Sequence, residues 1–180
     1  MADYGVPQKR RRHFIVASLA RTVDLSSMLQ PHQTPPRTVS WAILDLMHSA
    51  GGILDQPSRV SPINEKRINF LFRNNKYDLP NSLRPDCHRL KPHTYNSVYG
   101  RMHWDRPAQT LTSGFTSMGQ GRYVHPECHR TITPHEAARL QFIPDFFHFQ
   151  PLCNRSQLSE IIANAVPPRL TYILALELLR

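Results

Sequence analysis

The sequence has few cysteines and no long apolar run, and each shortage narrows what the protein can be. Its 180 residues include three cysteines, Cys87, Cys128 and Cys153, which are widely spaced and form no Cys-x-x-Cys pair. This set argues against a disulfide framework and fits a reducing cytoplasm. No apolar run approaches the roughly 18 residues of a membrane span, and no signal-peptide pattern opens the sequence. We therefore expect a soluble protein without a membrane partner.

Acidic residues are scarce relative to basic ones. The sequence has 13 Asp and Glu against 22 Lys and Arg, a formal net charge of +9 and a pI of about 10.0. Such a balance favours a polyanionic partner, nucleic acid before a membrane surface. The alternative is that the charge reflects solubility alone, and composition does not decide between the two.

One group of residues has the chemistry of a metal site. His125, Cys128 and His129 could form a zinc corner together with Cys87 and His88. Their spacing matches no common zinc pattern. We prefer the interpretation that they are loop and packing residues, and we predict no metal site.

Residues 99–147 form the most informative stretch. Aromatic, basic and small polar residues open it, and glycines follow at positions 114, 119 and 121. A loop of this composition, held by a helix, can follow a phosphate backbone and reach base edges.

A helix start is clearly marked inside this stretch. Thr133 is suited to cap the helix, Pro134 to occupy its first position, and Glu136 to complete a capping box. The helix is predicted to run through Gln141 and to stop before Pro144.

Apolar residues recur at helical spacing in four other segments. The periodicity predicts helices over residues 39–50, 65–73, 156–165 and 169–179. The last is apolar on most faces but too short to span a membrane. It therefore needs a partner surface larger than these residues obviously supply.

Basic residues alternate near the start of the sequence. Gln8, Arg10 and Arg12 would share one face of an extended chain, between a turn at residues 4–7 and an apolar run at residues 14–17. We interpret residues 14–17 as a buried strand. A basic run is otherwise commonly a solvated tail or a localisation signal.

Three segments, taken together, resemble the DNA cytosine-5 methyltransferases. Residues 3–12 resemble the Gln-x-Arg-x-Arg motif, the eighth of ten in that family. Residues 130–141, with the tail at 144–147, resemble the ninth, although His135 stands where the family commonly has Arg. Residues 162–168 resemble the tenth, and Thr110-Leu111 matches a recurring Thr-Leu step of the family's target recognition domain.

The resemblance implies a fold and its divisions. We expect an α+β chain, made of the C-terminal part of a class I (Rossmann-like) α/β methyltransferase and a small mixed target recognition domain. Residues 1–23 would end the catalytic sheet. Residues 24–147 would form the recognition domain with the ninth motif, and residues 148–180 the helices that return to the catalytic domain.

The resemblance also implies roles for the eighth motif. Enzymes of this family flip a cytosine out of double-stranded DNA, attack its C6 with a cysteine thiolate, and methylate C5 from S-adenosylmethionine. By resemblance, Arg12 would hydrogen-bond the cytosine O2, while Gln8 and Arg10 would orient the base pocket. A permanently protonated guanidinium with fixed donors suits that task.

Further expected contacts follow from the other motifs. We expect DNA contacts at six residues of the recognition region: Arg101, Arg106, Thr110, Thr112, Arg122 and Arg130. Asn164 and Ala165 would lie beside the S-adenosylmethionine site. Ala163 replaces the family's usual glycine there, and its methyl group could crowd the turn.

Several family motifs are absent from the sequence. There is no Phe-x-Gly-x-Gly cofactor turn and no Glu-Asn-Val segment, and none of the three cysteines follows a proline. No residue replaces the thiolate that the reaction needs. We therefore expect the second half of a bacterial cytoplasmic restriction–modification methyltransferase, which binds cofactor only together with a complementing subunit. The alternatives are an inactive truncated remnant and a free-standing sequence-specific DNA-binding module.

Overall fold

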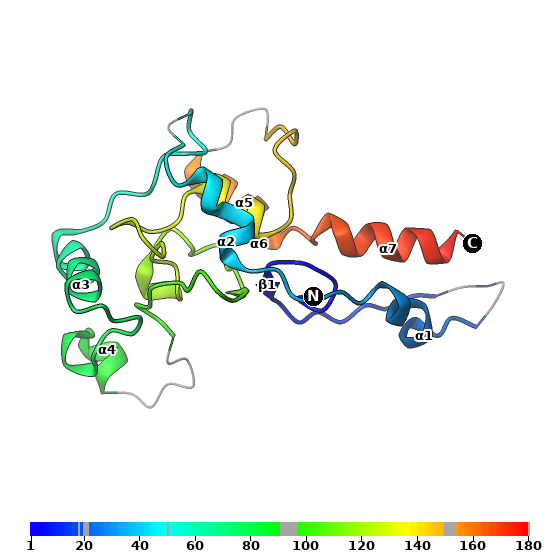
Figure 1. Ribbon diagram of the computed structural model, residues 1–180, viewed down its shortest axis with the longest axis horizontal. Coiled ribbons are helices and arrows are strands. Elements are labelled where there is room, and N and C mark those ends of the chain that lie inside the picture. Colours follow the sequence, from blue (N-terminus) through cyan, green and yellow to red (C-terminus); the bar gives the residue numbers. More distant parts are fainter. Residues whose placement is uncertain (18, 20–21, 50, 91–96, 150–153, 180) are drawn as a thin grey trace.

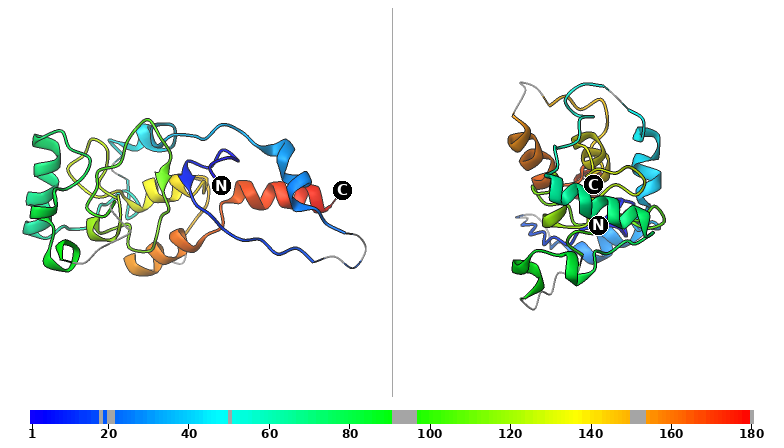
Figure 2. Two further views of the ribbon diagram at one scale, coloured as in Figure 1. Left: turned by 90° about the horizontal axis from the view of Figure 1, so that it is seen from below. Right: turned by 90° about the vertical axis from the view of Figure 1, so that its left-hand side faces the viewer.

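The chain forms a broad body from which two helical segments project side by side (Figures 1 and 2). The computed structural model describes residues 1–17, 19, 22–49, 51–90, 97–149 and 154–179. The projection, which we call the finger, consists of α1 (Leu25–Leu29), η1 (Gln30–His32) and α7 (Pro168–Leu178), with the extended residues 11–17.

The body contains the remaining elements. Its helices and 3-10 turns are α2 (Val39–Ile43), η2 (Leu44–Leu46), α3 (Pro62–Arg73), η3 (Asn81–Leu83), α4 (Asp86–Arg89), η4 (Met118–Gln120), α5 (Pro134–Leu140) and α6 (Arg155–Asn164). Its sheet pairs β1 (Gln8–Lys9) with β2 (Ala108–Gln109) in parallel, with Gln8 opposite Ala108. The fold is thus mixed α/β and mostly helical.

Two apolar clusters stabilise the body. The larger lies among α2, α5, α6 and the segment after β2, where Ile43, Leu111, Leu140 and Ile162 are fully buried or nearly so. The smaller lies under α3. Because the larger cluster draws on residues from both sides of position 147, helix α6 packs directly on the region assigned to target recognition. The division at residues 23 and 147 stays a prediction.

The helix predictions hold with adjusted ends. The capping box of α5 is present as predicted, with Thr133 accepting from the Glu136 amide and Glu136 accepting from the Thr133 amide. Helix α6 has its own capping box at Asn154, two residues before the predicted start. The helix predicted over residues 39–50 ends at Ile43 and continues as the 3-10 turn η2.

The strand predicted at residues 14–17 is wrong. These residues are extended but pair with no strand in the described part of the chain, and the Ile15 side chain is 97% exposed. A β-rich apolar run becomes a buried strand only when a neighbouring strand and a covering layer are available. The described residues provide neither at this position.

Helices α6 and α7 together reach a length that neither reaches alone. Residues Arg155–Leu178 are long and apolar enough, by length and composition only, to cross a membrane. However, residues 165–167 between them are not helical, and each helix is only about half of the roughly 30 Å needed at 1.5 Å per residue. Composition is therefore weak support for a membrane span.

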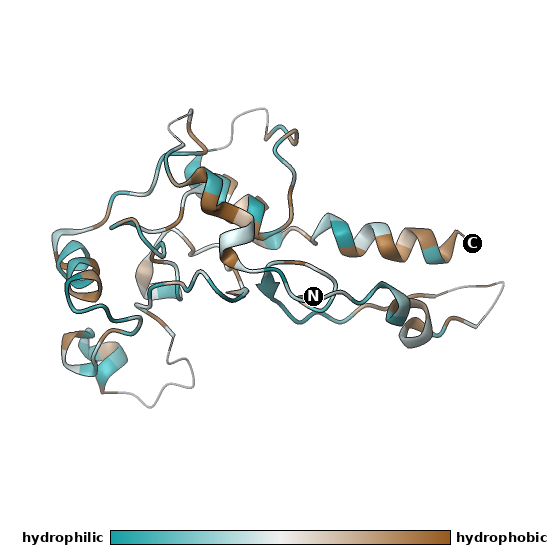
Figure 3. Cartoon of the chain, viewed as in Figure 1, coloured by the Kyte–Doolittle hydropathy of each residue, from teal (hydrophilic) through white to brown (hydrophobic). Residues whose placement is uncertain are grey.

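Polar contacts hold the finger in place, but part of its apolar surface is exposed to solvent. His32 Nε2 lies 2.8 Å from Glu177 Oε1 and links η1 to α7 within the finger. Arg169 Nε donates to the Tyr4 carbonyl at 3.3 Å and joins α7 to the N-terminal turn. Figure 3 shows apolar residues along α7 towards its C-terminal end. Leu170 and Ile173 are buried, whereas Tyr172 is 61% and Leu179 88% exposed.

Candidate DNA-binding cleft

The basic segment at the start of the sequence forms an arm that leaves a tight turn. Gly5 has φ +76°, a conformation that side chains rarely adopt, and a Cβ there would lie 2.9 Å from Thr34 Oγ1. Beyond this turn β1 aligns the arm with β2. The turn and the short parallel pair set the direction of the residues that follow, from Arg10 to Arg12.

Gln8 is fully buried and attaches the arm to two distant segments. Its Oε1 accepts a hydrogen bond from the Leu111 amide at 2.9 Å. Its Nε2 donates to Gln141 Oε1 at 2.6 Å and to the Leu140 carbonyl at 3.3 Å. Because an unpaired buried amide costs about 1–3 kcal/mol, this full set of partners strongly favours one position of the arm.

Gln141 extends the same network to the end of α6. Its Nε2 lies 2.9–3.0 Å from the carbonyls of Ile162, Ala163 and Ala165, which accept its hydrogen bonds. Carbonyls at a helix C-terminus lack partners within the helix, so a buried amide suits them. Two glutamines therefore connect the segments that resemble the eighth, ninth and tenth motifs. The sequence analysis gave Gln141 no role of its own.

Arg10 and Arg12 have opposite environments. Arg10 is buried, and its Nη1 donates to the Leu111 carbonyl at 2.9 Å. Burial first, and then the nearby Arg12 charge, lowers the pKa of Arg10 below its ordinary value. Arg12 is exposed and donates only to the Arg11 carbonyl, at 2.7 Å, among the described residues. Arg10 thus fixes the backbone of the arm, while the Arg12 head group remains accessible.

The arm borders a cleft of about 1140 Å³. Six basic side chains line it against one carboxylate, which gives it a positive field suited to a polyanion. One wall is the arm with the segment after β2 (Lys9, Arg11, Arg12, Gln109, Thr110, Thr112), the other runs along η3 and α4 (Asp78, Leu79, Asn81, Arg84, His88, Arg89), and the remaining lining residues are Ser97, Gln120, Gly121, Arg122 and Tyr123.

Thr110 and Thr112 lie in the cleft but are held by internal hydrogen bonds. Thr110 Oγ1 donates to the Lys9 carbonyl at 2.7 Å. The Tyr123 hydroxyl donates to the Thr110 carbonyl at 3.0 Å and accepts from the Thr112 amide at 3.1 Å. The threonines therefore shape the wall. Tyr123, which the sequence did not single out, fixes their backbone.

Arg122 also lines the cleft, and Arg101 lies behind it. Arg122 Nη1 donates to the carbonyls of Tyr77 (2.9 Å) and Arg101 (3.0 Å), and its Nη2 is paired with Asp78. The Arg101 guanidinium stacks between Phe72 and Tyr77, 4.6 Å from each ring centroid. Both arginines thus hold loops together within the body.

Arg106 lies outside the main cleft. It is exposed, pairs with Asp105 at 3.2 Å, and borders a neighbouring hollow of about 180 Å³ together with His103 and Lys9. Burial, and then the charges of Arg106 and Arg122, lowers the pKa of His103.

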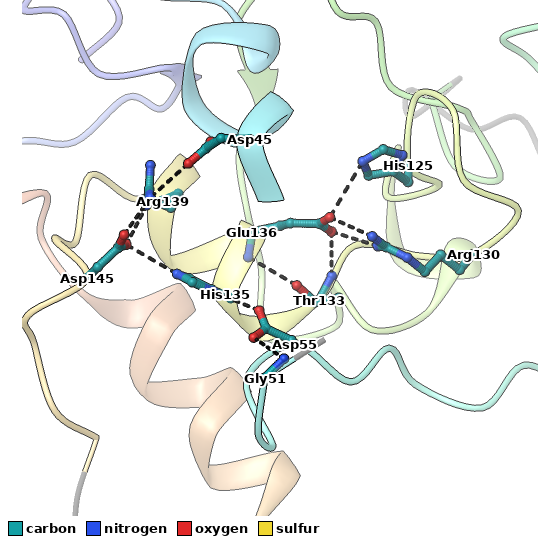
Figure 4. Close-up of polar contacts among 10 residues, drawn as sticks. All are labelled: Asp45, Gly51, Asp55, His125, Arg130, Thr133, His135, Glu136, Arg139 and Asp145. Carbon is teal, nitrogen blue, oxygen red and sulfur yellow. Dashed lines mark hydrogen bonds and ion pairs between the residues drawn. The ribbon is translucent and has the colours of Figure 1, made fainter. Parts of the chain in front are cut away.

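Arg130 holds the N-terminal turn of α5 through Glu136 (Figure 4). Its two terminal nitrogens donate to the two oxygens of buried Glu136 at 2.7 and 2.8 Å, and Glu136 also accepts from the Thr133 amide at 2.8 Å. Burial acts to lower the pKa of Arg130, but the bonds and charge of Glu136 outweigh it and raise that pKa. The guanidinium is already occupied by a protein carboxylate.

His125 packs against the same pair in its neutral form. Its Nδ1 accepts from the amides of Glu127 (3.0 Å) and Cys128 (2.8 Å), so the proton resides on Nε2, 3.5 Å from Glu136 Oε1. Burial, followed by the Arg130 charge, lowers the pKa of His125 to about 3. The contact with Glu136 is therefore not an ion pair at neutral pH.

The outer face of α5 carries a second polar cluster, also drawn in Figure 4. His135 bridges Asp55 Oδ1 at 2.7 Å and Asp145 Oδ1 at 3.2 Å. Arg139 pairs with Asp145 and, at 3.1 Å, with Asp45. The bond from Arg139 is the main cause of the lowered pKa of Asp145, opposed by burial. A histidine at position 135 thus has a clear structural role.

The remaining candidates are dispersed. Asn164 is exposed at the end of α6, and the Ala165 carbonyl accepts from Gln141. Burial is the main cause of a raised pKa at the Cys128 thiol, the opposite of what a nucleophile needs. Cys153 lies outside the described residues. Within the described residues no three His, Cys, Asp or Glu side chains are grouped as metal ligands.

Comparison with known proteins assigns the family. The sequence matches the family described as C-5 cytosine-specific DNA methylase over residues 1–180.

The chain belongs to this family. It is 56% identical over 177 residues to the type II methyltransferase M1.BsuMI of Bacillus subtilis (strain 168), covering 98% of the chain and 41% of that protein. It is 35% identical over 185 residues to the type II methylase M.HgiDII of Herpetosiphon aurantiacus, covering 96% and 51% respectively. The chain therefore spans about half or less of the length of these relatives.

A more distant similarity covers part of the chain. The mouse DNA (cytosine-5)-methyltransferase 1 is 38% identical over 94 residues, which is 48% of this chain and 6% of that protein.

The structure brings some of the site residues predicted from the sequence together and separates others. Gln8, Arg10, Arg12 and the two threonines meet where the arm contacts the segment after β2. Arg122 lines the same cleft, Arg106 borders the adjacent hollow, and Arg101 and Arg130 are engaged in packing. Their roles towards DNA and cofactor stay predictions. The wall formed by residues 78–89 was missed because its irregular, polar sequence gives no periodic signal.

Proposed function

We propose that this chain supplies DNA target recognition and part of the base pocket of a DNA cytosine-5 methyltransferase of the type II restriction–modification class. The complete enzyme transfers a methyl group from S-adenosylmethionine to C5 of a flipped cytosine. In this proposal the chain works together with a separate polypeptide that carries the missing motifs and the nucleophile, and it acts on double-stranded DNA in the bacterial cytoplasm.

The observation that carries the proposal is the position of the arm. Gln8 and Arg10 are buried and attached to Leu111, whereas Arg12 is presented to a cleft of about 1140 Å³ lined by basic groups. When a base has left the duplex, the protein recognises its polar edge by hydrogen bonds from groups held in fixed positions. The arm meets this need because its backbone is held at Gln8 and Arg10, directly before the accessible guanidinium of Arg12.

Arg12 is the residue proposed to contact the base. Its guanidinium would donate to the cytosine O2 and offset the negative charge that develops on the ring when C6 is attacked. Gln8 and Arg10 would act indirectly by orienting the arm. Lys9 and Arg11, which also line the cleft, would contact phosphates on either side of the base.

The nucleophile is proposed to come from the other polypeptide. The Cys128 thiol is partly buried with a raised pKa, and neither Cys87 nor Cys153 follows a proline. A nucleophilic cysteine requires a lowered pKa and a fixed approach to the substrate.

The cofactor site is likewise incomplete in the described residues. Asn164 is exposed, and Ala165 presents a carbonyl that is already paired with Gln141. These two residues do not fit S-adenosylmethionine by themselves, and the sequence has no Phe-x-Gly-x-Gly turn. We propose that they form one edge of a site completed by the missing motifs, and no step is assigned to them.

The finger is the proposed docking surface for that polypeptide. Ile15, Tyr172 and Leu179 are all more than half exposed, and they lie on or next to α7 and the extended arm. Large apolar patches left in solvent mark interaction sites more often than chance. The two bacterial relatives have about half or more of their sequence outside the region matched by this chain, and we propose that the corresponding segment covers this surface.

Salt dependence of duplex binding tests the proposed recognition role. The purified chain should bind double-stranded DNA with an affinity that falls steeply between 50 and 200 mM salt, as phosphate contacts require. Arg11→Ala should reduce the slope of log affinity against log salt by about 0.9, the value for one phosphate. Arg59→Ala, an exposed arginine outside the cleft, is the charge-matched control. An affinity independent of salt would contradict the proposal.

A free-standing DNA-binding module is the second candidate, because the cleft is formed within this chain alone. A free-standing module would bind duplex DNA with the same salt dependence, but no mixture that contains it would transfer a methyl group. An inactive remnant would show neither duplex binding nor methyl transfer.

A further inference from the structure

The two walls of the cleft differ in chemistry. The arm wall presents three cations, Lys9, Arg11 and Arg12, beside Gln109 and two threonines, and it has no carboxylate. The opposite wall, which we call the far wall, consists of residues 78–89 around η3 and α4, and it mixes a carboxylate and an amide with arginine and histidine. Figure 1 shows β1 and α4 well separated across the body. Such a difference suggests that the walls meet different parts of one ligand.

The far wall is held rigidly on α3. Leu79 is buried in the smaller apolar cluster, and Arg84 Nε donates to its carbonyl at 3.1 Å. From α3, Arg67 Nε donates to the Leu83 carbonyl at 2.9 Å, while the Leu83 amide donates to Pro80 at 3.0 Å. Side chains carried by such an anchored turn are pre-oriented, which recognition requires.

Asn81 is the first residue of η3 and is exposed on this wall. Its side-chain amide makes no hydrogen bond to another described residue, whereas Asp78 on the same wall is paired with Arg122. An amide offers a donor and an acceptor together, the pattern that matches adenine N6 and N7 in the major groove. Contacts to phosphates, in contrast, position the protein on the duplex and carry no sequence information.

Resting on the proposed function, we propose that the far wall reads the target sequence and that the Asn81 amide is a specificity-determining group that contacts a base edge. The arm wall, with its unopposed cations, holds the phosphate backbone. A carboxylate beside a polyanion is unfavourable in a surface that only binds phosphate, and this supports the division of tasks between the walls.

Selection from a pool of randomised duplexes tests this division with the full chain. The native chain should enrich a sequence motif. Asn81→Ala should lose the preference at one or two positions by about 5- to 150-fold, the range for one bidentate base contact. Its affinity for the unselected pool should change less than about threefold. Asn81→Asp, which can only accept at neutral pH, should shift the preference towards cytosine, whose N4 donates.

Two variants complete the comparison. Arg11→Ala should weaken binding to all sequences alike without altering the motif. Gln56→Ala removes an exposed amide outside the cleft and should change neither affinity nor motif. Because Asn81 is exposed, thermal unfolding of its variants should match the native chain.

The possible outcomes separate the two proposals. No binding to any duplex would overturn the proposed function together with this inference. Duplex binding with an unchanged motif in both Asn81 variants would overturn only the role of the far wall. Binding without any enriched motif would also overturn it, and would leave non-specific DNA binding in place.

Discussion

The body and the finger differ in how far their apolar residues are buried. In the body, buried polar groups such as Glu136 and Gln141 have hydrogen-bond partners, and many apolar side chains are buried in two clusters. In the finger, Ile15 and Leu179 are 97% and 88% exposed. The contrast teaches that the body is stabilised by its own contacts, whereas the finger has an apolar face that its own contacts do not cover. Breaking contacts should therefore have opposite consequences in the two regions.

The largest loss of stability is expected in the body at Glu136. Glu136→Ala removes the two carboxylate oxygens that accept from the Arg130 guanidinium and the acceptor for the Thr133 amide. Breaking a buried pair in this way costs about 3–5 kcal/mol of unfolding free energy. Urea denaturation measures it. Glu160→Ala, on the exposed side of α6, is the control and should change stability by less than about 0.5 kcal/mol.

Acidification should also weaken the body through His125. Its pKa is about 3 in the folded chain, below the roughly 6.5 of an unfolded histidine, so the unfolded state binds the proton first. The contribution of neutral His125 is present above pH 6.5 and is lost as pH falls towards 3, by up to about 1.4 kcal/mol per pH unit. In His125→Gln this part of the pH dependence should disappear. An identical pH slope in both proteins would mean that His125 accepts a proton in the folded state.

A smaller loss is expected at Gln141. Gln141→Leu preserves volume but leaves the Gln8 amide and the carbonyls at the end of α6 without this partner. We expect a cost of about 1–3 kcal/mol in thermal or urea unfolding, because each unpaired buried group loses its solvation. Gln56→Leu serves as the surface control. A neutral Gln141→Leu would show that the motif segments are held together by apolar packing alone.

The smallest effect on the isolated chain is expected in the finger. Replacing Tyr172 and Leu179 by serine should change the unfolding free energy by less than about 0.5 kcal/mol, because both side chains are largely exposed already. The same double variant should weaken association with the remaining part of the Bacillus subtilis relative at least tenfold. Pull-down and titration would measure this. A strong loss of stability in the isolated chain would place these residues in a core of their own.

Local signals in the sequence predicted much of the body. The capping residues of α5 and the apolar spacing of α6 and α7 depend on neighbours within a few residues, and they were found correctly. The Gln8–Gln141 network joins residues 133 positions apart, and spacing carries no information on such contacts. The error at residues 14–17 has the same origin, because a strand is defined by partners elsewhere.

The candidate site was predicted in part. Family motifs indicated Gln8, Arg10 and Arg12, but the sequence could not show that the first two are buried and only Arg12 is accessible. Arg130 was expected at DNA because it lies in the predicted recognition region, yet its guanidinium is occupied by Glu136. Charge alone does not distinguish an arginine that binds a ligand from one that stabilises a helix.

Methyl transfer in a reconstituted mixture is the most direct test of the central claim. The chain would be combined with the remaining part of the Bacillus subtilis relative, duplex DNA and labelled S-adenosylmethionine. Each component alone should transfer no label, the mixture should transfer it, and Arg12→Ala should abolish transfer while duplex binding stays within about threefold of the native chain. Arg59→Ala should behave as the native chain. Transfer by this chain alone, or full activity of Arg12→Ala in the mixture, would contradict the claim.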